Sequence, residues 1–121
     1  MARKHHGLKV WQKSMELVKE IYGLTAKFPS QERYALVMQM RRAAVSVPSN
    51  IAEGAGRRGP KEFSHFLLVA RGSLSELETQ VIIARMLGYL ESTSSIEEKI
   101  DMVFALLAGL LNSIGTRETV Q

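Results

Sequence analysis

Apolar residues recur at helical spacing along four segments of the 121-residue chain, and the first segment carries two such stripes. It runs from about Lys9 to Lys27, and Pro29 is expected to end it. One stripe comprises Trp11, Met15, Val18, Tyr22 and Thr25; the other comprises Leu17, Ile21, Leu24 and Phe28. Spacings of three and four residues predict an α-helix. Two stripes cover more surface than one bundle core requires, which favours an additional contact between subunits.

The second segment begins at Ser30, a predicted N-cap, and extends towards Ala52. Pro48 lies within it, lacks an N–H group and crowds the preceding helical turn. Apolar residues keep their helical spacing across the proline, at Ala44, Val47 and Ile51. We therefore expect one continuous helix that is kinked near Pro48. The alternative is a helix that stops there and restarts with Ser49 as its cap.

The third and fourth segments predict two more long helices. The third begins near Pro60, which suits a first helical position, and ends at Gly88. Its apolar seam, spaced almost as in a heptad repeat, comprises Phe63, Phe66, Ala70, Leu74, Leu77, Val81 and Ala84. The fourth begins at a capping-box pattern in residues 94–97 and ends at Gly115. Its stripe comprises Ile96, Ile100, Val103, Leu107, Leu110 and Ile114.

Short connections between these long helices favour antiparallel neighbours. The predicted fold is therefore all-α: an antiparallel, up-down-up-down four-helix bundle that forms a single domain over residues 1–121. Residues 1–7 and 116–121 lie outside the helical pattern, and we expect them to be flexible.

Composition limits the cellular location and the kinds of partner that we expect for this bundle. The chain has no cysteine, which excludes disulfides and thiolate metal sites, and no apolar run of signal-peptide length follows its basic N-terminus. The longest apolar stretch, residues 102–111, is too short to cross a bilayer. We therefore expect a cytoplasmic protein without a membrane partner. The formal net charge of +4 permits nucleic-acid binding without requiring it.

No combination of residues in the sequence predicts catalysis, a metal site or a cofactor. His5 and His6 lie in the N-terminal arm and His65 on a predicted helix, and the Glu-x-x-His pair of a di-iron bundle is missing from the sequence. The glycine-rich residues 54–59 follow a helix and lack the Lys-Ser/Thr of a phosphate-binding loop. We therefore expect the chain not to be an enzyme.

Basic residues gather on the two middle helices and at the loop between them. The candidates for phosphate contacts in a nucleic acid are Arg41, Arg42, Arg57, Arg58 and Lys61. In the alternative interpretation, these side chains form salt bridges within or between subunits. Of two adjacent arginines on a helix, one usually points inward and the other outward. Aromatic residues are not interleaved with these clusters, which argues against recognition of single-stranded bases.

Several parts of the sequence together form a specific pattern. They are Leu8-Lys9-Val10-Trp11-Gln12, Ile21-Tyr22, Phe28-Pro29, residues 39–54, residues 72–78 and Gly88-Tyr89. Over about residues 8–90, this pattern closely resembles that of the 23S rRNA intervening-sequence protein family of four-helix bundles. Its most specific part reads Arg-Arg-Ala-Ala-Val-Ser-Val-Pro-Ser-Asn-Ile-Ala-Glu-Gly.

The resemblance implies a homo-oligomeric ring, a pentamer, and a link to RNA. Some relatives are encoded within insertions in ribosomal RNA genes. A related branch, the accessory variability proteins of diversity-generating retroelements, binds a reverse transcriptase and nucleic acid through a basic ring surface. The resemblance implies no catalytic residues. Besides the arginines, the motif or interface positions in this chain are Trp11, Ser49, Asn50 and Glu53.

The sequence therefore predicts a bacterial-type, non-catalytic oligomer that binds structured RNA or a ribonucleoprotein through repeated basic patches. The alternative is a protein-interaction scaffold, such as an accessory subunit of a reverse transcriptase, whose arginines pair with a partner's carboxylates. A third, structural interpretation places the arginines and Glu53 in the packing between subunits.

Overall fold

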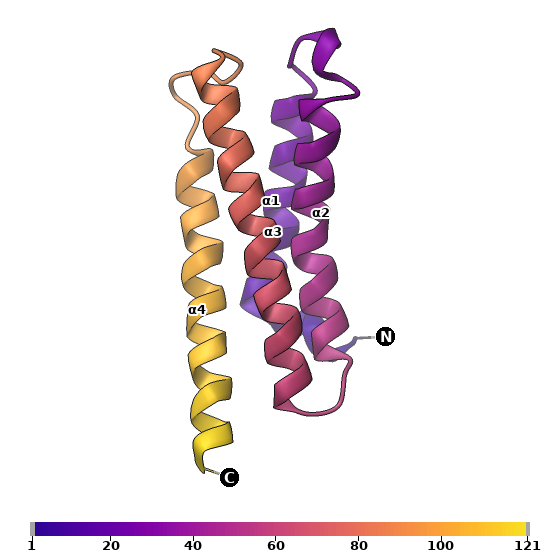
Figure 1. The fold of residues 1–121 in the computed structure, drawn as a ribbon, viewed down its shortest axis with the longest axis vertical. Coiled ribbons are helices and arrows are strands. Elements are labelled where there is room, and N and C mark those ends of the chain that lie inside the picture. The colour runs from indigo at the N-terminus through magenta and orange to yellow at the C-terminus, as the bar shows by residue number, and fades with distance from the viewer. Residues whose placement is uncertain (1, 121) are drawn as a thin grey trace.

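A computed structural model describes residues 2–120 of the chain, with side chains for residues 2–115. In chain order its elements are η1 (Lys4–Gly7), α1 (Lys9–Thr25), η2 (Ser30–Glu32), α2 (Leu36–Ala55), α3 (Pro60–Met86) and α4 (Ile96–Val120). The elements η1 and η2 are short 3-10 helices, and no strand occurs among the described residues. The four long helices pack against one another (Figure 1), which confirms the predicted all-helical fold with four helices.

Figure 1 separates the connections between the helices into two ends of the bundle. The N-terminus and the turn from α2 to α3 lie at one end, whereas η2 and the connection from α3 to α4 lie at the other. Gly59, in the turn from α2 to α3, and Gly88, in the connection from α3 to α4, have φ angles of 85° and 79°. Residues with a Cβ rarely adopt such angles, so glycine fits both turns.

The core of the bundle follows the predicted seams, except that Leu67 replaces Phe66 on α3 and Leu110 on α4 is only half-buried. On α4, the buried residues are Ile96, Ile100, Val103, Leu107 and Ile114. On α3, they are Phe63, Leu67, Ala70, Leu74, Leu77, Val81 and Ala84. The prediction of Phe66 in this seam is wrong, because Leu67 occupies the core-facing position and Phe66 is half-buried. Positions 66 and 67 are about 100° apart around a helix, so only one of them faces the core.

The two stripes of α1 have different environments. Leu17 and Ile21 from one stripe are buried in the core. Met15 and Tyr22 from the other stripe remain 45% and 42% exposed. Part of the stripe that contains Met15 and Tyr22 is therefore open to contacts outside the bundle.

The second long helix begins later than the sequence predicts. Ser30 starts the 3-10 helix η2, and α2 begins only after Ala35. Hydrogen bonds of the tighter 3-10 type join Glu32 N to Pro29 O at 2.9 Å and Arg33 N to Ser30 O at 3.1 Å. The cap-like pattern at Ser30 therefore opens a short turn at the end of the bundle rather than α2 itself.

The helix α2 runs through Pro48 without a break, so the alternative of a helix that stops and restarts there is wrong. The hydroxyl of Ser49 donates to Val45 O at 2.8 Å, and the amide of Asn50 donates to Ser46 O at 2.8 Å. These side chains add donors to the turn in which the proline supplies no N–H. The kink near Pro48 stays a prediction.

The helices α2 and α3 approach each other closely at Gly54. A Cβ built on Gly54 would lie 2.8 Å from Phe66 Cβ, which is too short for two carbon atoms. Elsewhere along the pair, the Ser46 and Ser73 hydroxyl oxygens are 2.8 Å apart and hydrogen-bonded. Small residues within the specific pattern of residues 41–54 therefore allow this close contact.

Helical structure reaches further towards both ends of the chain than the sequence predicts. The helix α4 continues past Gly115 to Val120, so the prediction that Gly115 ends it is wrong. Near the other terminus, residues 4–7 form η1, and Arg3 N donates to His6 Nδ1 at 2.9 Å. Flexibility of residues 1–7 and 116–121 stays a prediction. It falls partly on Met1, on Gln121 and on the side chains after Gly115, which lie outside the described part of the chain.

Candidate nucleic-acid interface

The two ends of the bundle differ in charge. We define the basic end as residues 2–9 and 53–62, and the opposite end as residues 27–33 and 85–99. The basic end has six cationic residues and two glutamates, whereas the opposite end has four of each sign. The excess at the basic end therefore equals the +4 formal net charge of the whole chain. Its cations are Arg3, Lys4, Lys9, Arg57, Arg58 and Lys61.

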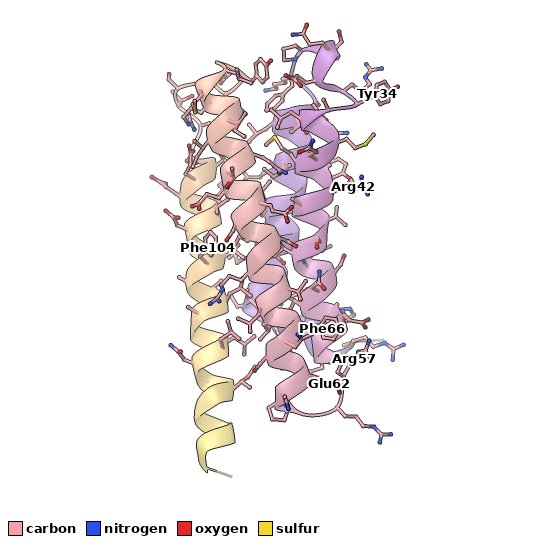
Figure 2. The ribbon with its side chains drawn as sticks, in the orientation of Figure 1. Tyr34, Arg42, Arg57, Glu62, Phe66 and Phe104 are labelled. Atoms are coloured by element: carbon pink, nitrogen blue, oxygen red, sulfur yellow. The ribbon has the colours of Figure 1, made fainter. Side chains whose placement is uncertain are left out.

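The turn between α2 and α3 presents three of the predicted site residues. Arg57 pairs with Glu53 at 3.1 Å, and its guanidinium carbon lies 5.1 Å from the centre of the Phe66 ring (Figure 2). Arg58 and Lys61 are exposed, and neither has an ion-pair partner within the described part of the chain. An exposed pair such as that of Arg57 contributes only about 0–1 kcal/mol. All three cations can therefore exchange their present surroundings for an external anion at little cost.

The N-terminal arm adds cations to the same end. Its helix η1 contacts both α1 and α2, and Lys4 Nζ lies 5.1 Å from the centre of the Phe63 ring near the start of α3. A lysine over an aromatic face is attracted by the electrons of the ring. Sequence reasoning missed Arg3 and Lys4 as site residues because nothing in the local pattern shows that the arm folds back towards α3.

Aromatic rings accompany these cations: His5 and His6 lie between Lys4 and Lys9 in the sequence, and Trp11 follows Lys9 by two residues. His5, His6 and Trp11 form a cluster in which neighbouring ring centres are 4.4, 5.1 and 5.2 Å apart. All three rings are half-buried, and so is Phe66 beside Arg57. The sequence has no ring interleaved with residues 57–61, whereas the fold places the Phe66 ring beside Arg57. Sequence adjacency places the two histidines at the basic end, and folding brings Phe66 beside Arg57.

The other two predicted arginines lie far from the basic end. Arg42 lies 13 residues before the end of α2 at Ala55, which corresponds to roughly 20 Å along the helix axis. Arg41 points inward, where its Nε donates to Thr25 Oγ1 at 3.0 Å and its Nη2 donates to Tyr22 O at 3.3 Å. Arg41 thus ties the last turn of α1 to α2, while Arg42 is exposed.

Arg41 and Arg42 line a groove of about 560 Å³ on the outer face of α1 and α2. The groove is also lined by Tyr22, Tyr34 and Met38. Tyr34 is 78% exposed, and Figure 2 shows it on the same side of the molecule as Arg42. Tyrosine, methionine and arginine are enriched where proteins bind one another. The predicted arginines therefore belong to two separate surfaces, this groove and the basic end.

At the opposite end, an arginine is engaged by several internal partners. Arg85 Nε and Nη2 donate to the two carboxylate oxygens of Glu97 at 2.6 and 2.7 Å. The same guanidinium group donates to Glu91 O at 3.3 Å and to Ser94 O at 3.2 Å. The hydrogen bonds from Arg85 lower the pKa of Glu97, and those to Glu97 raise the pKa of Arg85.

Two further contacts close the opposite end. The Tyr89 hydroxyl donates to Glu32 Oε2 at 2.8 Å, and this hydrogen bond raises the pKa of Tyr89. Lys99 on α4 pairs with Glu20 on α1. The connection from α3 to α4 is therefore fastened to η2, while α4 is fastened to α1.

The remaining motif residues have different surroundings. Asn50 is half-buried and also donates to Ser46 Oγ at 2.9 Å, whereas Ser49 and Glu53 are exposed. Among the described residues, no three His, Cys, Asp or Glu side chains gather as they would around a metal ion. Within the same part of the chain, no helix is both long and apolar enough to cross a membrane.

Comparisons with known proteins bear on these surfaces. Residues 6–109 match the sequence profile of the 23S rRNA-intervening sequence protein family. The chain is also similar to a solved structure from Bacteroides thetaiotaomicron VPI-5482, a protein of unknown function from the S23 ribosomal protein family. The two have a TM-score of 0.78 and 21% sequence identity over 85% of this chain and 95% of that chain. No curated protein matches this sequence.

Proposed function

Because this chain belongs to the 23S rRNA-intervening sequence protein family, we propose that it is a non-catalytic, cytoplasmic protein that binds structured RNA or a ribonucleoprotein. The basic end is the binding surface. The family name connects its members with an intervening sequence of ribosomal RNA, and it indicates no catalytic activity.

The observation that carries this proposal is the distribution of charge. The basic end holds an excess of positive charge equal to that of the whole chain, and Arg58 and Lys61 are exposed there. Cations that neutralise phosphates release the counterions condensed on a nucleic acid, which makes binding favourable and sensitive to salt. Exposed lysines and arginines without internal partners suit this role, because binding breaks no contact that the fold needs.

We also propose that the protein forms a homo-oligomeric ring, a pentamer, in which several basic ends bind one RNA molecule together. Two exposed stripes at helical spacing support this assembly. On α2 the stripe comprises Met38, Arg42, Val45 and Ser49; on α3 it comprises Leu68, Gly72, Ser75, Thr79, Ile82 and Met86. Each stripe combines exposed apolar residues, Met38 and Val45 on α2 and Leu68, Ile82 and Met86 on α3, with polar residues or glycine on the same helix face. An exposed helix face that carries several apolar residues is suited to packing against another helix.

The two stripes serve as the two sides of one contact in the proposed ring. They lie on different helices, and the α2 stripe of one copy packs on the α3 stripe of the next. Such head-to-tail contacts close into a ring when the rotation between copies permits.

A single substitution tests the oligomer. Val45 is 40% exposed, and Val45→Glu places a charge in the proposed contact. We expect light scattering to show that this variant loses the oligomeric mass while circular dichroism stays helical. Met102 on α4 is 49% exposed, and Met102→Glu is the matched control. A native mass in the Val45 variant would contradict the proposed contact.

RNA binding is tested with charge variants of the oligomer. We expect Arg57→Ala/Arg58→Ala to weaken binding to a structured ribosomal RNA fragment by about 10-fold at low salt, because two phosphate contacts are lost. Lys19→Ala/Lys27→Ala removes the same charge from exposed positions on and beyond α1 and should bind almost normally. Equal effects of the two double variants would indicate that the charge acts without a defined site.

A protein-interaction scaffold remains the second candidate, and the groove beside Arg42 favours it. An accessory subunit of a reverse transcriptase would use this surface, in place of the contact between copies, to bind a partner's acidic and apolar residues. This function predicts that Arg42→Ala weakens binding to the partner protein while Arg58→Ala does not. A reverse-transcriptase gene adjacent to the gene for this chain would favour the scaffold.

A further inference from the structure

The aromatic cluster of the N-terminal arm is held in place before any ligand binds. His5, His6 and Trp11 contact one another through their rings. The Gln12 side chain donates to His6 O at 2.7 Å, and Arg3 N donates to His6 Nδ1 at 2.9 Å. These two bonds fix the position of His6, and through the ring contacts they support the other two rings.

The cluster borders the cations of the basic end. Helix η1, which carries both histidines, contacts α2, and Lys4 from the same helix lies over Phe63 of α3. Within the α2–α3 turn, Arg57 lies over the Phe66 ring of α3. The basic end therefore combines rings and cationic groups in two places, the arm and the turn.

This combination matches the chemistry of an unpaired nucleotide. Unpaired bases stack on aromatic side chains and on guanidinium planes, while lysines and arginines bind the adjacent phosphates. The bases of an A-form duplex are already stacked and paired, so the interior of a duplex offers these rings no free base face for stacking. A site that needed phosphate contacts alone would gain nothing from the rings.

We propose that the basic end binds unpaired nucleotides of RNA, with a base stacked on the His5–His6–Trp11 cluster and the phosphates bound by Arg3, Lys4 and Arg58. This inference rests on the proposed function in RNA binding and narrows its ligand to loops, bulges or single-stranded ends. The duplex parts of a structured RNA are then bound only through their phosphates.

The cluster contains the only tryptophan of the chain, so its fluorescence reports directly on the site. We would titrate the full-length oligomer with a 12-nucleotide RNA that cannot pair with itself, with the same RNA annealed to its complement, and with a 12-unit abasic backbone. We expect only the single strand to quench Trp11 strongly. Its affinity should exceed that of the abasic backbone by at least about fivefold, as the loss of stacking by one base predicts.

Matched variants separate the rings from the charge. His5→Ala/His6→Ala should lower the single-strand affinity to about that of the abasic backbone and leave duplex affinity unchanged. His5→Phe/His6→Phe keeps two rings without imidazole groups and should retain most of the binding. The wild-type comparison of single strand with abasic backbone does not depend on the folding of either variant.

Two outcomes overturn the inference, and they differ in what they leave standing. Salt-sensitive binding of all three probes with equal affinity, and with no change in Trp11 fluorescence, would show that the basic end binds phosphates alone. The proposed function would then survive without the stacking site. Failure of every probe, and of a structured ribosomal RNA fragment, to bind at low salt would refute the inference together with the proposed function.

Discussion

At the opposite end of the bundle, Arg85 donates to both oxygens of Glu97 and to two backbone carbonyls. At the basic end, Arg57 has a single exposed ion pair, with Glu53, and lies over the Phe66 ring, while Arg58 has no ion-pair partner in the described part of the chain. The same residue type thus fastens the fold at one end and is left open at the other. This contrast distinguishes arginines that stabilise the bundle from arginines available to a ligand.

The close approach of α2 and α3 is the interaction that holds the basic end together, and its loss should have the largest effect on stability. Gly54→Ala places a Cβ 2.8 Å from Phe66 Cβ, so the two helices must separate. We expect a loss of about 1–3 kcal/mol in the free energy of unfolding, measured by urea denaturation. Gly109→Ala meets no atom within 4 Å on α4 and should instead raise stability by up to about 1 kcal/mol. A Gly54→Ala variant with the free energy of unfolding of the wild type would contradict the close packing.

The opposite end should depend on its arginine. Arg85→Met keeps an apolar stem but removes the donors to Glu97, Glu91 and Ser94. We expect a clear decrease in melting temperature, because three groups at the α3–α4 connection lose their partner. A melting temperature equal to that of the wild type would show that these contacts do not fasten this end.

Acid should weaken the same contact. Because Arg85 lowers the pKa of folded Glu97, the unfolded chain binds a proton more readily, and stability decreases as the pH falls. The contribution is complete above the ordinary pKa of a glutamate and is lost as the pH falls through the lowered value. The stability difference between wild type and Arg85→Met should therefore shrink from about pH 6 to about pH 3. A constant difference across this range would contradict the assignment.

The corresponding arginine-to-methionine substitution at the basic end should have the smallest effect on stability. Arg57→Met removes an exposed pair with Glu53 and should change the free energy of unfolding by less than about 0.5 kcal/mol. The informative measurement is its comparison with Arg85→Met by thermal denaturation in the same buffer. If Arg57→Met lowered the melting temperature as much as Arg85→Met does, the proposed difference between the two ends would be contradicted.

The sequence predicts the helical elements well where an uninterrupted apolar seam decides them. Leu74, Leu77 and Val81 face the core because their spacing leaves one face of α3 apolar. The sequence pattern does not predict the start of α2 correctly, because Ser30 opens a 3-10 turn with the same local pattern as a helix cap. Phe66 is wrongly predicted to face the core, because its neighbour Leu67 fits the apolar seam of α3 equally well.

The candidate site was only partly accessible from the sequence. Arg57, Arg58 and Lys61 are adjacent in the chain, so their common location could be predicted. Arg41 also lies in a basic pair, but its role depends on Thr25 and Tyr22 in another helix. The arm's cations and rings, such as Lys4, join the site only through tertiary contacts with α2 and α3, which no local pattern encodes.

The central claim is that the basic end, rather than the net charge of the chain, binds RNA phosphates. Its most direct test is the slope of log affinity against log salt concentration for a structured ribosomal RNA fragment. We compare the wild type, Arg57→Ala/Arg58→Ala and the control Lys19→Ala/Lys27→Ala as intact oligomers. The account predicts that the basic-end variant loses about 0.7–0.9 in slope for each phosphate contact removed, while the control keeps the wild-type slope. Identical slopes for the three proteins would contradict it.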